Sequence, residues 1–205
     1  MNYNGLLLTI RKPEEGDLET ITQWLADPLF LSTFYGSPLD TYQTRLSQVK
    51  EFLNQNAKDF SSNVTLIAID KKSDEPVGLI MFNNINWKHR HAEVSMVIGA
   101  EKFRGSYYGV DIHLMGLVYA FYELNLHKVF GYAYESKVED LKLHDFGGKV
   151  NGVLRKHVYR NGKFLNLVAH SVTETEFKTF VGSQKKKLLK NHMKKGVLEV
   201  FQTVA

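Results

Sequence analysis

The stretch Glu93–Leu124, EVSMVIGAEKFRGSYYGVDIHLMGLVYAFYEL, predicts a strand, a basic glycine-containing turn and a helix in direct succession. Its first part, Glu93–Ile98, is short, rich in apolar and β-branched residues, and ends at Gly99, which is typical of a half-buried strand. Behind the turn, apolar residues recur at helical spacing and form one predicted stripe: Val110, Leu114, Leu117, Val118 and Phe121.

The turn itself, Phe103–Gly109 (FRGSYYG), is the clearest functional signal in the chain. A strand that passes through such a turn into a helix leaves several backbone N–H groups unpaired at the helix start. These donors and the helix dipole favour a phosphate or another anion, and Arg104 adds a cation beside them. Because most strand–turn–helix units bind no phosphate, a purely structural turn is the alternative interpretation.

Composition limits the class of protein. The 205 residues predict one domain, and 43% hydrophobic with 12% aromatic residues are enough for an ordinary core. The absence of cysteine excludes disulfides, thiolate metal sites and a cysteine nucleophile. The first residues do not resemble a signal peptide, and no apolar run approaches the roughly 20 residues of a membrane span. We therefore expect a cytoplasmic protein without a membrane span.

Positive charge gathers at the C-terminal end. The net charge is +4, but the segment from Lys178 onward holds seven lysines and a single acid, Glu199, so the rest of the chain is slightly negative. We expect a main domain over residues 1–180 and a lysine-rich helical extension over 181–205. The extension could contact nucleic acid, an acidic protein or a membrane surface, or it could be a solvated helix face.

Hydrophobic periodicity and turn residues predict the order β-α-α-β-β-β-α-β-α-β-β, an α+β fold with a mixed sheet and helices on both faces. An aromatic loop with Phe30, Phe34 and Tyr35 joins the first two helices, where a substrate lid could form. The predicted strands are Leu6–Arg11, Val64–Asp70, Val77–Asn84, Glu93–Ile98, Lys128–Tyr134, Val150–Tyr159 and Phe164–Val172. Besides the central helix, the predicted helices are one capped by Asp17, then Thr41–Gln55, Val138–Asp145, Thr173–Phe180 and, after a Gly182-Ser183 linker, Lys185–Phe201.

Three blocks carry a resemblance to a known family: LTIRKPEEGDLETITQWLADP, AEVSMVIGAEKFRGSYYGVD and LHDFGGKVNGVLRKHVYRNGKFLNLVAHSVTETEF. In this order they resemble the GNAT acetyltransferase superfamily over Leu6–Phe177. The nearest branch acetylates the N-termini (alanine) of ribosomal proteins, and its relatives act on antibiotics and sugars. The resemblance implies a mostly antiparallel central sheet.

The resemblance also implies acetyl-CoA as the acyl donor. In the family the central strand splays from the next strand and pairs with pantetheine, while the amides of the turn hold the pyrophosphate. Val97 and Ile98 would then line the pantetheine arm. The residues implied around the pyrophosphate are Arg104, Gly105, Ser106, Tyr107, Tyr108, Gly109 and Val110.

The chain departs from the family pattern at three places. Tyr107 stands where the first glycine of the Arg/Gln-x-x-Gly-x-Gly turn is expected, and it brings a Cβ atom and a ring to that position. Ser136 and Glu139 replace an asparagine and a small residue, and Leu143 stands at the place of a tyrosine that often acts as general acid. The first two departures concern the donor site, so an acyl carrier protein remains an alternative donor.

Acetyl transfer to an amine needs a base, and the leaving thiolate needs an acid. Glu93, at the start of the splayed strand, is the predicted base, although a salt-bridge partner is the alternative. Tyr134 and Ser136 could supply an acidic hydroxyl, and an N–H near Val97–Ile98 would polarise the carbonyl.

No metal site is predicted, because the pair formed by His89 and His91 has no third ligand at a recognisable spacing. Trp87 and the aromatic loop could line the acceptor pocket or simply belong to the core.

The sequence thus predicts an N-acyltransferase that moves an acetyl group from acetyl-CoA to a primary amine by direct attack in a ternary complex. The acceptor could be a small molecule, an amino sugar or a peptide N-terminus. A carrier-protein-dependent transferase and a non-catalytic GNAT-fold binding protein are the alternatives. Packing of the C-terminal helix on a second copy would give a homodimer.

Overall fold

The computed structural model describes residues 3–27, 50–51, 54, 61–137, 147–160 and 162–190. These residues form one eight-stranded sheet in the order β1-β2-β3-β4-β5-β6-β8-β7, in which only the β5–β6 pair is parallel. The strands are Tyr3–Asn4 (β1), Leu8–Arg11 (β2), Val64–Asp70 (β3), Pro76–Asn86 (β4), His91–Ile98 (β5), Lys128–Tyr134 (β6), Lys149–Arg160 (β7) and Lys163–Thr173 (β8). The expected mixed, mostly antiparallel α+β fold is therefore confirmed.

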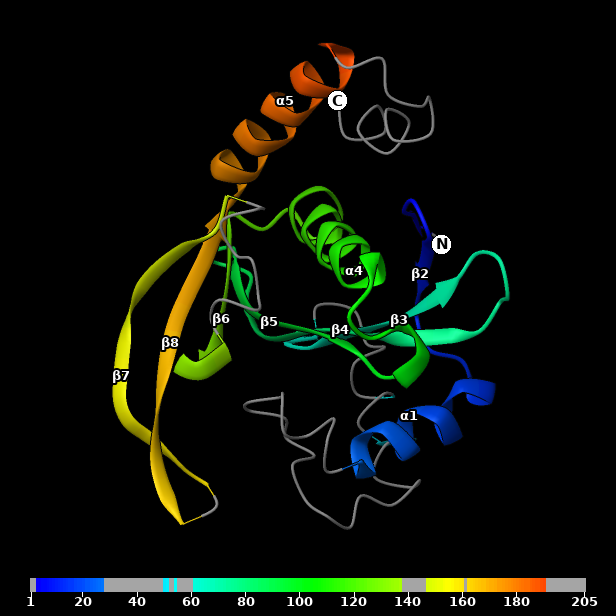
Figure 1. Ribbon diagram of the computed structural model, residues 1–205, viewed down its shortest axis with the longest axis horizontal. Coiled ribbons are helices and arrows are strands. Elements are labelled where there is room, and N and C mark those ends of the chain that lie inside the picture. The colour runs from blue at the N-terminus through cyan, green and yellow to red at the C-terminus, as the bar shows by residue number, and fades with distance from the viewer. Residues whose placement is uncertain are drawn as a thin grey trace.

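Helices cover both faces of the sheet (Figure 1). The described helices are α1 (Leu18–Ala26), α4 (Tyr107–Val118), a π-helical turn that continues α4 (Tyr119–Glu123), and α5 (Glu174–Lys190). Short 3₁₀ turns lie at Glu15–Asp17, Glu101–Phe103 and Glu135–Lys137. Because α4 and α1 lie on opposite sides, the molecule has two apolar layers.

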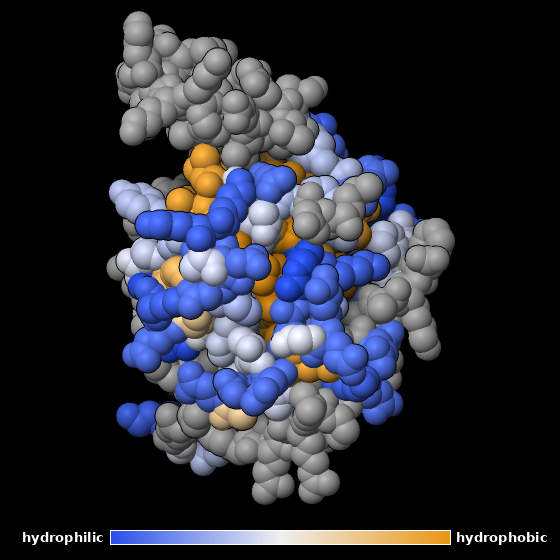
Figure 2. Space-filling view, turned by 90° about the vertical axis from the view of Figure 1, so that its right-hand side faces the viewer, coloured by the Kyte–Doolittle hydropathy of each residue, from blue (hydrophilic) through white to orange (hydrophobic). Residues whose placement is uncertain are grey.

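The larger apolar layer lies between the sheet and α4. Its fully or nearly fully buried residues include Leu8, Ile10, Leu66, Ile80, Phe82, Ile112, Phe121 and Phe177. The smaller layer packs α1 against the other face through Leu18, Ile21, Leu25, Ile67, Ile69, Leu79 and Met81. The side of the molecule near the N-terminus is covered mostly by hydrophilic side chains, with apolar residues visible only between them (Figure 2).

The predicted apolar stripe of the central helix is only partly correct. Leu114, Leu117 and Phe121 are buried, but Val110 is 44% exposed. The helix also buries Asp111 on a side that the stripe did not include. Since α4 is enclosed on most sides, its apolar residues do not need to keep to one face.

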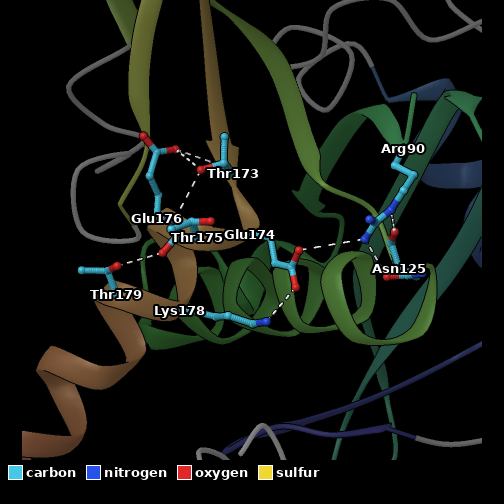
Figure 3. Close-up of polar contacts among 8 residues, drawn as sticks. All are labelled: Arg90, Asn125, Thr173, Glu174, Thr175, Glu176, Lys178 and Thr179. Atoms are coloured by element: carbon cyan, nitrogen blue, oxygen red, sulfur yellow. Dashed lines mark hydrogen bonds and ion pairs between the residues drawn. The ribbon is translucent and has the colours of Figure 1, made fainter. Parts of the chain in front are cut away.

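α5 begins in a reciprocal cap (Figure 3). The carboxylate of Glu176 accepts hydrogen bonds from the backbone N–H and the hydroxyl of Thr173, and the N–H of Glu176 donates back to Thr173 Oγ1 at 3.3 Å. Glu174 pairs with Lys178 at 2.7 Å and approaches Arg90 at 3.9 Å, and Arg90 in turn donates to Asn125. These contacts fix the start of α5 to the loops beside β5 and β6.

The expected linker at Gly182-Ser183 is wrong, because α5 runs through both residues to Lys190. The boundary of the predicted lysine-rich extension therefore falls inside a continuous helix, and the division of the chain into two parts stays a prediction.

β1 was not predicted from the sequence. Several predicted features lie outside the described residues: the aromatic loop, most of Thr41–Gln55, Val138–Asp145 and the chain after residue 190.

Candidate active site

β5 and β6 form a fork. Their parallel pairing covers three positions, ending where Glu93 stands beside Phe130, and no pairing follows although both strands continue. Beyond Glu93, the backbone groups of β5 and β6 that face each other therefore have no ladder partner across the fork. Peptide groups left without partners in this way are available to a ligand.

The two faces of the fork carry different side chains. Val94, Met96 and Ile98 pack against the α4 layer, whereas Val97 packs against the α1 layer. Because side chains alternate along a strand, Glu93 lies on the same face as Val97, toward α1.

Glu93 is half-buried and stands opposite Asn83 of β4, which is 8% exposed. Burial raises the pKa of the Glu93 carboxyl above its ordinary value, and no other cause contributes. A carboxylate with a raised pKa at the closed end of a fork is a reasonable proton acceptor.

Along β5, the backbone N–H and C=O groups of successive residues face β4 and β6 in turn. A Cβ atom built on Gly78 of β4 would lie 2.0 Å from the carbonyl oxygen of Val97, so this carbonyl points toward β4. A Cβ atom on Gly131 of β6 would lie 2.9 Å from the carbonyl oxygen of Val94, which points into the fork. By alternation, the peptide groups of Met96 and Ile98 also face the fork. Of the two residues expected to line it, only Ile98 thus directs its backbone into the fork, and its carbonyl oxygen accepts a hydrogen bond from Arg104 Nε at 3.3 Å.

The turn after β5 has the expected geometry for an anion site. Gly105 adopts φ +68°, and Ser106 is the N-cap residue of α4 in an extended conformation. Among the described residues, no acceptor contacts the N–H groups of Gly105, Ser106, Tyr107 or Tyr108. The added Cβ atoms of Gly105 and Gly109 would meet nothing within 4 Å, so the turn borders open space.

The side chains of the turn point in different directions. Tyr107 is 82% exposed, and Val110, predicted at the same site, is also exposed. Ser106 Oγ donates to the carbonyl of Phe103 at 2.5 Å. The ring of Tyr108 packs on Phe103, with ring centres 4.5 Å apart, and so turns away from the open side. The phosphate contacts of this turn would therefore come from its backbone.

The hydroxyl of Tyr108 donates to Asp70 Oδ1 at 2.7 Å. This hydrogen bond, together with burial, raises the pKa of Tyr108 to about 12. Burial opposes ionisation of Asp70, but hydrogen bonds from Tyr108 and Ser73 outweigh it, so the pKa of Asp70 is lowered. The pair fastens the first turn of α4 to the end of β3.

Arg104 is engaged with the protein itself. Its Nη2 donates to the carbonyl of Gly99 at 2.8 Å and lies 3.4 Å from Asp27, and its Nε donates to the carbonyl of Ile98 at 3.3 Å. The guanidinium therefore ties the turn to the end of β5. It adds positive charge near the turn Phe103–Gly109, and its Nε and Nη2 groups already have partners within the protein.

The predicted acid candidates lie at the end of β6. The hydroxyl of Tyr134 accepts a hydrogen bond from Arg160 Nη1 at 3.1 Å, and the Arg160 guanidinium lies 5.5 Å from the centre of the Tyr134 ring. Ser136 is exposed in the following 3₁₀ turn. Tyr134 and Glu93 share the α1 face, because side chains of β6 alternate and Val129 belongs to the α4 layer.

Sequence reasoning missed Arg160 and His170, which reaches the fork from β8. A histidine in an alternating strand gives no signal of its neighbours until the pairing register is known. Within the described residues, no group of three His, Asp or Glu side chains could hold a metal ion. No described helix has the length and apolar character needed to span a membrane.

Comparisons with known proteins agree with this geometry. Residues 8–140 match the family described as acetyltransferase (GNAT) domain. The chain is 23% identical over 171 residues to spermidine N(1)-acetyltransferase of Vibrio cholerae, and the match covers 83% of this chain and 95% of that protein. It is 24% identical over 177 residues to the uncharacterised N-acetyltransferase p20 of Bacillus licheniformis, covering 83% and 94%.

Solved structures show the same architecture. The crystal structure of spermidine N-acetyltransferase from Vibrio cholerae in complex with CoA and spermine matches with a TM-score of 0.75 at 22% sequence identity. The match covers 84% of this chain and 98% of that chain. Mutant forms of the Vibrio cholerae spermidine/spermine N-acetyltransferase give a TM-score of 0.72 at 22% identity, covering 84% and 97%. At this level of identity the likeness establishes a shared fold.

Proposed function

Since this chain belongs to the acetyltransferase (GNAT) domain family and is an N-acetyltransferase that uses acetyl-CoA and acts on an amine, we propose that this amine is a small cation such as a polyamine, bound on the α1 face of the fork. The observation that carries the proposal is the composition of that face. There the carboxylate of Glu93 stands beside a row of aromatic side chains on β6.

The aromatic row is Phe130, Tyr132 and Tyr134, which alternate onto the α1 face. Phe130 and Tyr132 contact edge to face with centres 6.1 Å apart, and the ring of His91 lies 5.8 Å from Phe130. Aromatic faces and a carboxylate attract an ammonium group, and burial strengthens both attractions. The named relative that acts on spermidine supports the same acceptor class.

We assign the roles at the fork as follows. The N–H groups of Gly105, Ser106, Tyr107 and Tyr108, for which the described part of the chain supplies no acceptor, would hold the pyrophosphate of acetyl-CoA, and the exposed Tyr107 ring is free to move aside. Peptide groups of β5 that face β6 would hold the pantetheine arm, and one N–H of this arm would polarise the thioester carbonyl. Glu93 would accept the proton of the attacking amine.

A second acceptor class is favoured by the β7–β8 hairpin. Residues 149–173 contain five lysines or arginines and no aspartate or glutamate. Arg160 brings one of these charges to Tyr134, at the end of the aromatic row. A cation there suits an amine that also carries an anionic group, such as an acidic amino sugar or a peptide N-terminus with acidic neighbours. The resemblance to the ribosomal-protein branch remains a hypothesis of this second kind.

An acceptor panel separates the two classes. The purified chain is given acetyl-CoA with spermidine, spermine, an amino sugar phosphate or an acidic dipeptide, and the released CoA thiol is measured. The polyamine proposal expects kcat/KM for spermidine at least ~10-fold above the two anionic amines, and the reverse order would replace it with the second class.

Calorimetric titration with CoA and with 4′-phosphopantetheine tests the donor side. Tighter binding of CoA supports contacts of the turn with the nucleotide end. Equal affinity would mean that the nucleotide end beyond the phosphopantetheine arm adds nothing to binding.

A further inference from the structure

The tip of the β7–β8 hairpin extends beyond the rest of the sheet. β7 is an edge strand, and β6 ends at Tyr134, whose register partner on β8 is Leu167. From this point to the turn, β7 and β8 pair only with each other among the described strands, and they reach past the end of β6 (Figure 1). We call residues 154–160 and 162–167 the ribbon. Because a two-stranded ribbon has no neighbour in the sheet, its side chains face solvent or a partner.

A bulge shapes β7 within the ribbon. Residues 155–157 stand opposite a single residue of β8, Asn166. The N–H of Lys156, which adopts φ +49°, donates to Asn166 Oδ1 at 2.8 Å, and Asn166 Nδ2 donates to Glu135 Oε2 at 3.0 Å. The facing strand thus holds the bulge in one shape, although Lys156 is in the strained left-handed region that is enriched at binding sites. The bulge borders a groove whose described lining is Val153, Leu154, Arg155, Lys156, His157 and Asn166.

Positive charge predominates on the ribbon. It contains four lysines or arginines and no aspartate or glutamate. Arg155 and Lys156 of the bulge are both exposed, and no acid among the described residues pairs with either. Arg160 is engaged with Tyr134, and Glu135 brings one negative charge to the base of the ribbon. The bulge therefore presents two cationic side chains to an anionic partner.

Two aromatic rings are exposed beside these cations. Tyr159 and Phe164 are register partners, 65% and 63% exposed, with ring centres 5.0 Å apart. Register partners lie on the same face of a ladder, and residues two apart on a strand share that face. Both rings thus lie on the face of Asn166, which lines the groove at the bulge. The rings and the groove form one surface.

The chemistry of this surface favours one kind of partner. In a symmetric dimer built ribbon to ribbon, like charges would face each other. Addition of a strand to the β7 edge is hindered by the bulge and its basic side chains. An acidic protein would match the charge, but a nucleic acid strand matches both features, since it carries phosphates in a row beside flat unpaired bases.

We propose that the ribbon binds single-stranded nucleic acid. Arg155 and Lys156 contact phosphates, and the rings of Tyr159 and Phe164 stack on bases. Because every base offers a flat face, binding is tolerant of sequence. This surface is separate from the fork between β5 and β6, and the proposal does not depend on the acetyl acceptor.

The probes are fluorescently labelled oligouridine and oligothymidine of about 12 nucleotides. Fluorescence anisotropy with the full chain gives the dissociation constant at salt concentrations from about 50 to 200 mM. The slope of log affinity against log salt changes by about 0.7 for each phosphate that a cation neutralises on a single strand. The slope therefore reports charge contacts, and the affinity at fixed salt also reports stacking.

The variants separate charge from stacking. Arg155→Gln with Lys156→Gln removes both charges of the bulge, Tyr159→Ala removes one ring, and Tyr159→Phe retains it. Lys12→Gln with Lys88→Gln is the matched control, because it neutralises two exposed lysines outside the hairpin. Thermal unfolding of each variant verifies that the fold is retained.

We expect the two kinds of variant to differ in their salt dependence. The bulge double variant should make the slope shallower by about 1.4 and weaken binding ~10-fold at about 0.1 M salt. Tyr159→Ala should weaken binding ~10-fold with little change in slope. Tyr159→Phe and the lysine control should stay within about twofold of wild type.

Four results would overturn the proposal. The first is absence of binding to either strand at the lowest salt, and the second is an equal loss in the bulge variant and the lysine control. The third is polyglutamate binding as tightly as oligouridine with no effect of Tyr159→Ala, which would assign the ribbon to an acidic protein. The fourth is a dimer, seen by sedimentation velocity, that Tyr159→Ala converts to a monomer, which would assign the rings to a second copy.

Discussion

The carboxylate of Asp111 holds the backbone of Leu7 and its two neighbours. Oδ2 accepts the N–H of Leu7 at 2.8 Å and of Leu8 at 2.9 Å, and Oδ1 accepts the N–H of Leu6 at 3.0 Å. Asp111 is 2% exposed, and Gly5 lies so close that an added Cβ atom would be 2.7 Å from Oδ2. A single helical side chain thus fixes the entry of the chain into β2.

Substitution of Asp111 should therefore cost stability. Asp111→Ala leaves three buried or partly buried N–H groups without an acceptor, and we expect the free energy of unfolding to fall by roughly 3 kcal/mol. Asp111→Asn keeps one acceptor oxygen and should lose about half as much. Urea unfolding followed by circular dichroism measures both values, and an Ala variant as stable as wild type would show that water replaces the carboxylate.

Acid should weaken the start of α5. The ion pair with Lys149 at 2.6 Å and the hydrogen bonds from Thr173 outweigh burial and lower the pKa of Glu176 to about 2 from an ordinary 4.5. A carboxyl with a lowered folded-state pKa contributes stability above its unfolded pKa and loses it as pH falls through the folded value. The contribution of Glu176 should thus be complete above about pH 5 and disappear between about pH 4.5 and 2.

The comparison of wild type with Glu176→Gln over pH 2 to 7 measures this contribution. The variant should be less stable at pH 7, and the difference should shrink as pH falls. Glu15→Gln, which removes a carboxylate that is 84% exposed, serves as the control. A stability difference that is independent of pH would mean that packing, not charge, accounts for the effect of Glu176.

Much of the sheet could be predicted from the sequence because its strands are apolar and bounded by turn residues. The predicted bounds of β3 and β6 agree with the structure, and those of β4, β5, β7 and β8 differ by at most two residues at either end. β1 could not be found, since two residues carry no periodicity. The linker was misplaced because Gly182 is a helix breaker by propensity only, and a helix anchored by the buried Phe177 and Val181 continues through it.

The candidate site was harder to predict than the fold. The anion-binding turn follows from local sequence, because the glycine, the helix start and the strand are contiguous. The position of Glu93 at the closed end of the fork, the orientation of the Val97 carbonyl and the approach of His170 to Gly131 all depend on strand register. Register joins residues far apart in the chain, and a single sequence without relatives contains no direct signal of it.

Gly105 should be required for donor binding. With φ +68° it occupies the left-handed region, which costs a residue with a Cβ atom about 1–2 kcal/mol. Gly105→Ala can avoid that strain only if the turn changes shape and its N–H donors move. We expect the dissociation constant for CoA to rise ~10-fold by calorimetry. Gly152→Ala, at a position on β7 where an added Cβ atom also meets nothing within 4 Å, should leave the dissociation constant unchanged. Equal effects at both glycines would reject the turn around Gly105 as the site that binds the pyrophosphate.

Glu93 should determine the acidic side of the pH–rate profile. The base must be ionised to accept a proton from the amine, so kcat/KM should fall as pH drops through the pKa of Glu93, which burial raises above 4.5. Glu93→Gln should lower kcat/KM ~10²-fold, remove this limb of the profile and leave CoA affinity within about twofold. Glu19→Gln, on the exposed side of α1, should change neither. Full activity of Glu93→Gln, with the acidic limb intact, would mean that water or another group accepts the proton, and Glu93 would then be only a binding partner for the ammonium group.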